Sequence, residues 1–419
     1  MKRRRLLAAP LLAACSPERD DELRFWAMGR EAEVAPQLLR GFEREHPGVR
    51  LRIEALPWTA AHEKLLTAIA GDAAPDVAQM GNTWLPEMAQ LGALEPLDDQ
   101  LPELGLHAGE HFDGIWQTNR IQDRLVGLPW YVDTRLLFYR RDLLAQAGFA
   151  HPPQDWAQWR AALQALHRGA VPRPMLLPTN EFEPLLALAL QQPDELLREG
   201  GRHGNFSGTG FQKALGFYLD MFHQGWAPGV TNNQVANLYQ EFARGRFACY
   251  ISGPWNIGEF KRRLPADLQG AWATAPLPGP DGWGASVAGG ASLVVFKRSR
   301  RKALAARLIA YLSRPNVQLQ FYALTGNLPP RRATWALPRD GAPALRDDPH
   351  AAAFAMQLER TRPTPAVPEW ERIAQEMQLA AARGVHEGSS AAEIGRSLDA
   401  RVEGILAKRR WVLDREARA

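Results

Sequence analysis

The sequence predicts an α/β protein that begins with a parallel sheet. Strand-like apolar segments alternate with helix-like segments from residue 23 to residue 80, an order typical of parallel strands joined by right-handed crossover helices. Of the 419 residues, 46% are apolar and 23% are charged, which is the composition of a folded globular protein and excludes a disordered chain. The length is sufficient for about two or three domains of ordinary size.

Hydrophobic periodicity defines the elements of this first sheet. Residues 23–27 form a short apolar run, as in a buried strand. Val34, Leu38 and Phe42 recur at intervals of four and predict a helix, with Pro36 expected near its start. The segments that follow predict, in order, a strand over 49–55, a helix capped by Thr59 and ended by Gly71, and a strand over 76–80.

Beyond residue 80, strand-like and helix-like segments alternate less regularly. Consecutive strands are expected over 125–131 and 136–139, and further strands over 247–251 and 292–296. Between these last two lies a Pro- and Gly-rich connector at 277–284. Helical patterns predominate beyond residue 300, and we find no internal repeat.

Two loops of the first sheet are the expected place for a ligand. Ligands of open α/β sheets bind beyond the carboxyl ends of the strands. Residues 28–31 follow the first strand, and residues 81–84 follow the third. Both segments contain a Gly together with side chains that can hydrogen-bond or stack, so we expect binding residues in both.

The N-terminus has the pattern of a secretion signal. Residues 2–5 are basic and residues 6–14 are mostly apolar, a run too short to span a bilayer, which needs about 20 residues. It ends in Leu12-Ala13-Ala14-Cys15, which resembles a bacterial lipobox, although an ordinary signal with a chance cysteine has the same pattern. We expect a signal peptide over 1–14, acylation of Cys15 and a tether over 15–22.

Charge and cysteine content narrow the function classes. The net charge of +4 comes from the four basic residues of the leader, so the remaining chain is neutral, which argues against a nucleic-acid-binding protein. The second and last cysteine, Cys249, lies in an apolar run and is expected to be buried. If Cys15 is acylated, no intrachain disulfide can form.

Motifs for cofactor or metal chemistry are absent. The sequence has no P-loop, no complete dinucleotide fingerprint, no nucleophile elbow and no histidines at metal-binding spacing. We therefore predict no cofactor, no metal and no catalytic residue. A glycosidase carboxylate pair stays open, since such pairs are assembled in space rather than in sequence.

A set of short motifs stands in order along the chain. They are Phe42-Glu43 with Pro47-Gly48-Val49, Pro75-Asp76-Val77, Gly127-Leu128-Pro129-Trp130-Tyr131-Val132-Asp133-Thr134, Ser252-Gly253-Pro254-Trp255, Ala288-Gly289-Gly290, and Arg362-Pro363 with Ala366-Val367-Pro368. Together with the lipobox, this pattern resembles the extracellular solute-binding proteins of the ABC-transporter carbohydrate-uptake family, which includes maltose- and trehalose-binding proteins. The resemblance covers about residues 23–335, and the last motif is similar to a segment of the trehalose/maltose branch.

The resemblance implies the two-lobed periplasmic-binding-protein (Venus flytrap) fold, with the sugar in a cleft between α/β lobes hinged by crossover segments. By this analogy one lobe comprises 23–133 and 288–332, and the other comprises 138–284 and 337–419. The chain would cross between them near 133–137, 284–287 and 332–336.

The resemblance and the chemistry of sugars together suggest the binding residues. A sugar site needs planar polar groups for hydroxyls and aromatic rings for C–H faces. Trp255 resembles the family's stacking aromatic, with a core position as its alternative, and Asp133 resembles a hydroxyl ligand. The full candidate set is Arg30, Glu31, Asn82, Trp84, Trp130, Tyr131, Asp133, Trp255, Gly289, Gly290 and Arg362, with Arg331 and Trp283 as weaker candidates. Trp130 and Tyr131 can equally pack the hinge.

By resemblance, this chain is a monomer that binds an oligosaccharide and delivers it to the transmembrane permease of an ABC importer. A glucose disaccharide such as trehalose or maltose is favoured, and the protein would sit outside the cytoplasmic membrane, held only by a lipid. Two alternatives remain: an exported glycoside hydrolase, and a binding protein of the same fold for another solute such as a glycerophosphate ester or a polyamine.

Overall fold

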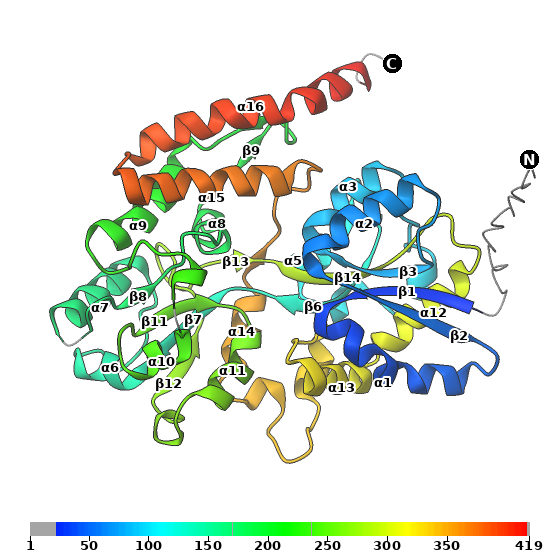
Figure 1. The fold of residues 1–419 in the computed structure, drawn as a ribbon, viewed down its shortest axis with the longest axis horizontal. Coiled ribbons are helices and arrows are strands. Elements are labelled where there is room, and N and C mark those ends of the chain that lie inside the picture. Colours follow the sequence, from blue (N-terminus) through cyan, green and yellow to red (C-terminus); the bar gives the residue numbers. More distant parts are fainter. Residues whose placement is uncertain (1–21, 170, 236, 417–419) are drawn as a thin grey trace, which may run out of the picture.

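The computed structural model describes residues 22–169, 171–235 and 237–416, and it consists of two lobes (Figure 1). Lobe 1 is built on a five-stranded sheet of order β2-β1-β3-β14-β6, and lobe 2 on a four-stranded sheet of order β12-β7-β11-β8. The two-lobed α/β fold expected from the sequence is confirmed. Cys15 and the leader lie outside the described residues.

Lobe 1 contains the parallel strands that the sequence predicts. Strand β1 pairs in parallel with β2 and β3, and β14 runs antiparallel to both β3 and β6. Its strands are β1 (Glu22–Met28), β2 (Arg50–Leu56), β3 (Val77–Gly81), β6 (Leu128–Asp133) and β14 (Gly289–Val295). Its main helices are α1 (Gly29–Glu45), α2 (Trp58–Ala70), α3 (Leu85–Gln90), α12 (Lys302–Leu312) and α13 (Pro315–Thr325).

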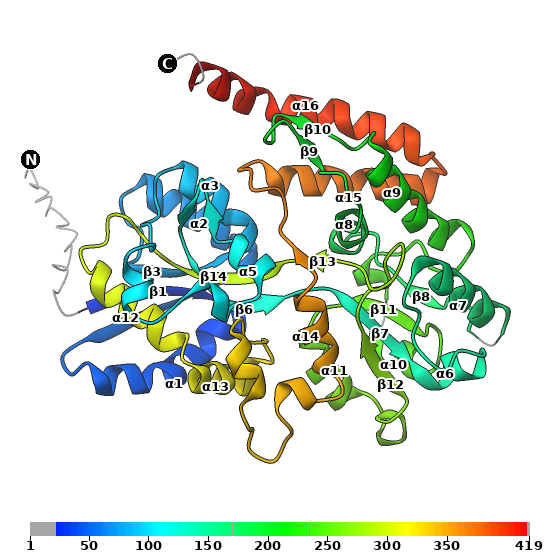
Figure 2. The same ribbon diagram turned by 180° about the vertical axis from the view of Figure 1, so that it is seen from behind.

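Lobe 2 has a shorter sheet surrounded by more helices (Figure 2). Its strands are β7 (Leu136–Arg140), β8 (Met175–Leu176), β11 (Cys249–Ser252) and β12 (Trp272–Ala275). Its main helices are α6 (Arg141–Gln146), α7 (Trp156–Arg168), α8 (Glu183–Leu190), α9 (Thr209–His223), α10 (Leu238–Ala243), α11 (Trp255–Arg263), α14 (Ala352–Leu358), α15 (Trp370–Glu387) and α16 (Ala391–Glu416). Among the described residues, no helix combines the length and the apolarity needed to cross a membrane.

Two details of the predicted elements are wrong. Helix α1 begins at Gly29, directly after β1, so Pro36 lies inside the helix and residues 29–31 form its first turn instead of a loop. The positive φ of Gly29, 52°, allows the chain to turn from strand into helix without a linker. Helix α2 begins at Trp58 after Pro57, so Thr59 is within the helix and does not cap it.

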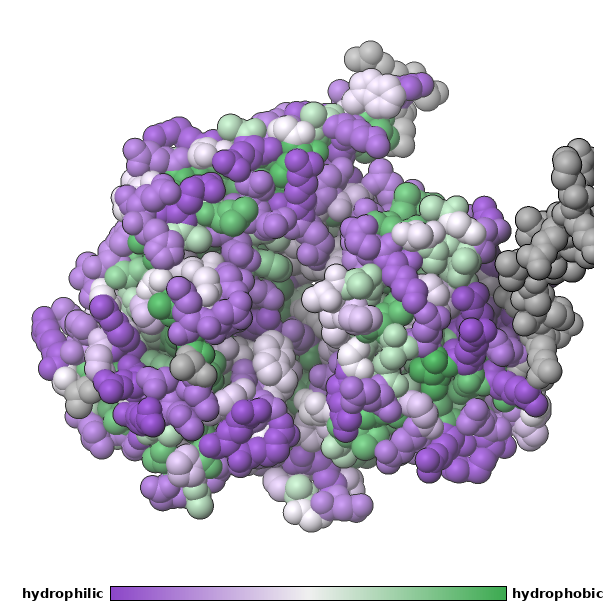
Figure 3. Space-filling model, viewed as in Figure 1, coloured by the Kyte–Doolittle hydropathy of each residue, from purple (hydrophilic) through white to green (hydrophobic). Residues whose placement is uncertain are grey.

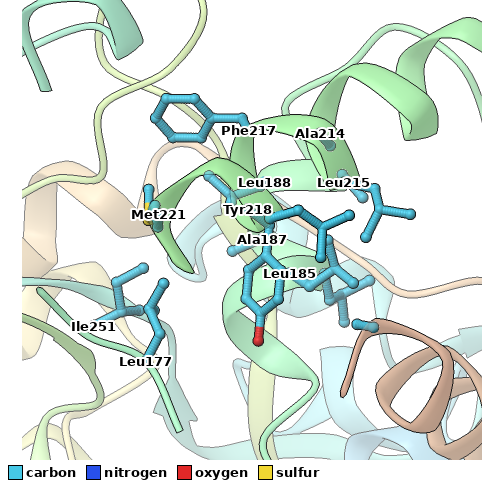
Figure 4. Close-up of a cluster of buried hydrophobic side chains, with 14 of the residues drawn as sticks. Leu177, Leu185, Ala187, Leu188, Ala214, Leu215, Phe217, Tyr218, Met221 and Ile251 are labelled. Carbon is cyan, nitrogen blue, oxygen red and sulfur yellow. The ribbon is translucent and has the colours of Figure 1, made fainter. Parts of the chain in front are cut away.

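Apolar side chains fill each lobe and continue through the connection between them. In lobe 2, Leu185 and Leu188 of α8 meet Leu215 and Tyr218 of α9 beside the sheet residue Ile251 (Figure 4). Another buried cluster joins residues on both sides of the first crossover, among them Val132, Phe138, Leu328 and Trp335. Cys249 is buried as expected, and burial raises the pKa of its thiol to about 12.

The crossovers lie side by side. The chain leaves β6 at Asp133 and enters β7 of the other sheet at Leu136. Strand β13 (Ser286–Val287), just before β14, pairs in parallel with β15 (Thr361–Arg362). The Ser286 hydroxyl donates to the backbone oxygen of Arg135 at 2.7 Å, so the first and second crossovers are joined directly. The exact lobe boundaries given above stay a prediction.

A fully buried histidine supports the third connection. His111 forms a backbone bridge with Arg331, its ring lies 5.0 Å from that of Trp116, and its Nδ1 lies 3.1 Å from the His107 oxygen. Burial lowers the pKa of His111 from 6.5 to about 4. The imidazole is therefore neutral in the folded protein at neutral pH.

This pKa predicts a loss of stability in acid. Between about pH 6.5 and pH 4 the unfolded chain binds a proton at His111 that the folded chain does not, so the free energy of unfolding falls as the pH falls, by up to about 1.4 kcal/mol per pH unit from this group. Above pH 6.5 the contribution is constant. Urea unfolding of His111→Gln should show a flatter pH dependence than wild type. The exposed His151→Gln is the control, and identical slopes for His111→Gln and wild type would refute the assignment.

Candidate interlobe binding site

A cavity of about 380 Å³ lies between the lobes beside the crossovers. On the face drawn in Figure 3 the surface is hollowed between lobe 1 and lobe 2. The lining residues from lobe 1 and the crossovers are Trp58, Gly81, Asn82, Thr83, Trp84, Tyr131, Asp133, Arg135, Val287, Ala288, Gly289 and Gly290; Phe182, Glu183, Thr364 and Glu371 line it from the lobe 2 side. The size is within the range of small-molecule sites, roughly 300–1,000 Å³.

Aromatic rings form the lobe 1 side of the cavity. Trp58 starts α2, and Trp84 ends the short 3-10 turn Asn82–Trp84 that follows β3. Their ring centroids lie 5.7 Å apart in an edge-to-face arrangement with an interplanar angle of 64°, and Trp58 remains 38% exposed. Tyr131 of β6 contributes a third ring. Aromatic surfaces of this kind accept the apolar face of a ligand.

Asn82 carries a buried donor with no partner. Its Oδ1 accepts the Ser292 hydroxyl at 2.8 Å, which fixes the orientation of the amide. Its Nδ2 is buried and has no hydrogen-bond partner among the described residues. A buried donor without a partner is costly, and Asn82 lines the cavity, so its amide is a candidate hydrogen-bond donor for a ligand.

Gly289 and Gly290 are required by the close approach of β14 to β6. A Cβ on Gly289 would lie 2.8 Å from the Asp133 oxygen, and one on Gly290 would lie 2.3 Å from the Tyr131 oxygen. Gly290 also has a φ of 123°, which other residues rarely adopt. Both glycines line the cavity, so the backbone itself forms part of its wall.

Arg135 is the central charged group. The Arg135 guanidinium lies at the first crossover and pairs with Asp133 at 2.6 Å and with Glu183, the first residue of α8, at 2.8 Å. Burial raises the pKa of Asp133, and the charge of Arg135 opposes this shift. The Nε of Arg135 is buried without a partner among the described residues. The polar part of the cavity therefore has one cation held by two carboxylates.

The lobes also touch across the cavity. The Thr83 hydroxyl of lobe 1 donates to the Glu371 carboxylate in the first turn of α15. A polar contact at this position holds the two lobes together in the conformation described.

The sequence and the fold of this chain are similar to those of known proteins. The model of the bacterial extracellular solute-binding protein family matches residues 28–319. The chain belongs to this family. The sugar-binding protein MalE of Xanthomonas citri is 51% identical, with a TM-score of 0.90 and coverage of 94% of this chain and 99% of that one.

Curated relatives from other bacteria match most of this solute-binding protein at lower identity. The diacetylchitobiose-binding protein DasA of Streptomyces coelicolor is 23% identical over 382 residues, or 86% of this chain and 87% of DasA. The arabinooligosaccharide-binding protein of Bacillus subtilis is 25% identical over 325 residues, or 73% of each chain.

Several predicted ligands of this solute-binding protein lie in the cavity wall or directly behind it. Asn82, Trp84, Tyr131, Asp133, Gly289 and Gly290 all line the cavity. Glu31 is buried behind Tyr131: its carboxylate accepts Asn327 Nδ2 at 2.7 Å and the Tyr131 hydroxyl. Burial raises the pKa of Glu31, while these two hydrogen bonds lower it.

Three predicted ligands are placed elsewhere by the structure. Arg30 is exposed and pairs with Glu33 at 2.7 Å, since the first turn of α1 directs it to solvent. Trp130 is buried in the core of lobe 1, stacked on Phe321 at 4.6 Å, where the register of β6 against β14 shifts and leaves Trp130 without a paired residue on β14. Arg362 donates to the backbone oxygens of Leu190 and Gln192, so it satisfies carbonyls at the end of α8 and does not line this cavity.

The two weaker candidates are also placed outside the cavity. Arg331 donates to the Ser313 oxygen and pairs with Glu110, and Trp283 packs on the lobe 2 core.

Trp255 is exposed and is not a core residue. It is the first residue of α11, it is 42% exposed, and its ring centroid lies 4.7 Å from the Arg135 guanidinium. It does not line the cavity itself in this conformation. The ring covers Gly253, where a Cβ would lie 2.0 Å from the indole. The indole is thus next to the polar centre of the site with much of its surface available.

Several lining residues escaped the sequence analysis. Trp58, Arg135, Glu183, Thr364 and Glu371 belong to no motif singled out there. Arg135 follows the Asp133-Thr134 pair, and an Arg two residues after a candidate carboxylate at a crossover is a signal that could have been used. Glu183 and Glu371 lie far away in sequence and offered no comparable signal.

The exposure of Trp255 leads to a binding prediction. Trp255→Ala should leave the melting temperature nearly unchanged, because the side chain is 42% exposed. If the indole stacks on a bound sugar, its loss removes on the order of 2 kcal/mol of binding, which is more than a tenfold loss of affinity by calorimetry. Trp411→Ala is the matched control, since Trp411 is 58% exposed on α16 and outside the cavity. Wild-type affinity in Trp255→Ala would contradict the stacking role.

Proposed function

We propose that this solute-binding protein captures an oligosaccharide in the interlobe cavity and delivers it to the permease of an ABC importer. A glucose disaccharide, trehalose or maltose, is the proposed ligand. The observation that carries the proposal is the pairing of aromatic rings on the lobe 1 wall with a buried unpartnered amide donor at Asn82. Rings suit the C–H faces of a sugar, and the amide suits a hydroxyl.

The comparisons support a sugar ligand of some kind. The names of the three relatives refer to a sugar, to diacetylchitobiose and to arabinooligosaccharides. These names differ in the sugar unit, so the choice of a glucose disaccharide rests on the resemblance of the motifs alone.

The pairing of Arg135 argues against a phosphate ester. A phosphate ester needs convergent cationic donors, whereas the one arginine in the cavity wall is already paired with Asp133 and Glu183. A polyamine needs clustered carboxylates. Asp133 and Glu183 are both paired with Arg135, whereas Glu371 accepts a hydrogen bond from the neutral Thr83 hydroxyl and keeps its charge. A neutral, hydroxyl-rich ligand can use the lining oxygens and the Asn82 amide as hydrogen-bond partners, and spermidine in the ligand panel tests the cationic alternative.

A ligand panel tests the proposal. Thermal shifts should rise with trehalose or maltose and stay flat with glycerol 3-phosphate and spermidine, because a ligand that binds only the folded state stabilises it by RT ln(1 + [L]/Kd). A shift only with the phosphate ester or the polyamine would overturn the sugar assignment. Prolonged incubation with either disaccharide should release no glucose, and sustained release would favour the glycoside hydrolase alternative.

Closure of the lobes is expected to accompany binding. A ligand can shift an open–closed equilibrium only through unequal affinity for the two states, and the cavity is lined from both lobes. Small-angle scattering should show compaction at saturating sugar. An unchanged scattering profile at saturation would refute closure.

The contact between the lobes at Thr83 gives a second prediction. Thr83→Ala removes the contact with Glu371 and should weaken sugar binding about 2- to 10-fold, the equivalent of one hydrogen bond. Thr231→Ala, at an exposed turn of lobe 2, is the control.

We further propose that the mature protein is anchored by a lipid on Cys15. Membrane fractionation of the expressing cells should place the wild-type protein with the membranes. Cys15→Ser should appear as unprocessed or released protein instead, because the acylated side chain is absent. Equal membrane retention of both forms would contradict the lipobox assignment.

A further inference from the structure

A second hollow separates helices of the two lobes, and we call it the interhelix groove. It has a volume of about 550 Å³ and adjoins the candidate cavity, because Glu371 lines both. Figures 1 and 2 show α16 passing over α15, with its C-terminal end extending toward the side of lobe 1 that carries α3. The lining residues include His62, Glu87 and Leu91 from lobe 1, and Arg372, Lys408 and Val412 from lobe 2.

The interhelix groove lies beyond the cavity as seen from the crossovers. Asp133, Arg135 and Val287 of the crossovers line the cavity, whereas no crossover residue is among those that line the groove. The contact between Thr83 and Glu371 stands where the two hollows meet. When the lobes turn about the crossovers, the walls of the groove therefore move through a larger distance than the walls of the cavity.

The two walls of the groove carry opposite charge. On the lobe 1 wall the Glu87 carboxylate lies 2.8 Å from His62 Nε2, and its side chain is still 32% exposed. This wall has a charge of −1 when His62 is neutral. On the lobe 2 wall, three bases against two acids leave a charge of +1; they are Arg372, Lys408 and Arg409, and Glu369 and Glu371.

Lys408 is the cation of this wall that has no partner. Its side chain is exposed and forms no hydrogen bond or ion pair with another described residue. The nearest acids along α16, Glu403 and Asp414, are each paired with another residue. Arg372 differs, because it directly follows Glu371 in the chain. Lys408 is therefore the group best placed to pair with a carboxylate across the groove.

Each wall also offers an apolar side chain one helical turn from its charge. Leu91 directly follows α3, four residues after Glu87, and it is 55% exposed. Val412 is half-buried and lies four residues after Lys408 in α16. Residues four apart lie on the same face of a helix, and all four side chains line the groove. Narrowing of the groove would bury apolar surface beside the charged groups.

We propose that α16 closes on α3 as a latch: when the lobes close, the Lys408 ammonium pairs with the Glu87 carboxylate and Val412 packs against Leu91. This latch deepens the proposed function and rests on its open–closed motion. None of the four residues lines the cavity. A contact made only in the closed state raises the closed fraction of the protein, so it raises the apparent affinity for the sugar without touching the sugar.

A pair of cysteines across the groove tests the contact. In protein carrying Cys15→Ser, the remaining natural thiol is the buried Cys249. Leu91→Cys with Val412→Cys should then form an intramolecular disulfide with copper phenanthroline as the oxidant, even without sugar, because thermal motion samples the closed state. Saturating trehalose or maltose should raise the rate at least about threefold, because sugar increases the closed fraction.

A second cysteine pair is the matched control. Ala407 is exposed on α16 but does not line the groove, so Leu91→Cys with Ala407→Cys should cross-link much more slowly. Equal rates in the two pairs, or no cross-link in the first pair with or without sugar, would overturn the latch.

A charge exchange tests the ion pair. Lys408→Glu and Glu87→Lys should each weaken sugar binding about 3- to 10-fold by calorimetry, because each replaces attraction across the groove by repulsion. The double variant should regain most of the wild-type affinity. About 0.5 M salt should reduce all of these differences, since it screens exposed charges.

The control exchange makes the same charge changes outside the groove. Glu43 and Arg168 are exposed on lobe 1 and lobe 2, and Glu43→Lys and Arg168→Glu should keep wild-type affinity, singly and together. A loss in Glu87→Lys that Lys408→Glu does not reverse would show that Glu87 acts only through its bond to His62, and it would overturn the ion pair.

The cross-link separates the latch from the sugar assignment. A disulfide in the first cysteine pair, together with no binding of any sugar, would refute the proposed function and leave the latch standing. Sugar binding without a disulfide in that pair would overturn the latch and leave the proposed function standing.

Discussion

One buried guanidinium organises the junction of the lobes. Arg135 lies in the first crossover, between the last residue of the lobe 1 sheet and the first strand of the lobe 2 sheet. A buried cation is tolerated only when it is paired and hydrogen-bonded, and here Asp133 of β6 and Glu183 of α8 supply the counter-charges. Because these two carboxylates come from elements of different lobes, the pairing fixes α8 against the crossover. The Ser286 bond to the Arg135 carbonyl extends the same constraint to the second crossover.

The interlobe cavity lies at that junction. Asp133 and Glu183 both line it, and Arg135 holds both carboxylates at its edge. The narrow approach of β14 to β6, which only glycine permits at 289 and 290, brings backbone to the same edge. The aromatic wall of lobe 1 then faces a polar centre in which Arg135 is paired with Asp133 and Glu183, and in which Asn82 Nδ2 and Arg135 Nε have no hydrogen-bond partner among the described residues.

The features that depend on local sequence pattern could be predicted from the sequence. Strand and helix order in lobe 1, the burial of Cys249 and the cavity positions of Asn82, Tyr131 and Asp133 all follow from periodicity or from motifs that occupy strand ends. The sequence could not separate Trp130 from Tyr131, which are adjacent in β6 and belong to the same buried cluster. Tyr131 also lines the cavity, whereas Trp130 lies at the register shift between β6 and β14 and does not line it. The contacts of Arg362 could not be read from the sequence, because its partners, the backbone oxygens of Leu190 and Gln192 at the end of α8, lie 170 or more residues away. Glu183 and Glu371 reach the cavity only through tertiary packing.

The two ends of lobe 1 carry different chemistry for a topological reason. In a parallel sheet all strands begin at one edge and end at the opposite edge, so ligand-facing residues gather at the carboxyl edge, where β1 leads into α1 and β3 leads into the Asn82 turn. The amino edge takes no part in the cavity. There the chain enters β1, and the Asp76 side chain accepts both the Arg24 amide of β1 and the Ser299 hydroxyl of the turn that follows β14. Antiparallel β14 connects the two edges: it starts at the cavity with Gly289 and ends at the turn that begins with Phe296 and Lys297. The whole length of β14 therefore separates that turn from the cavity.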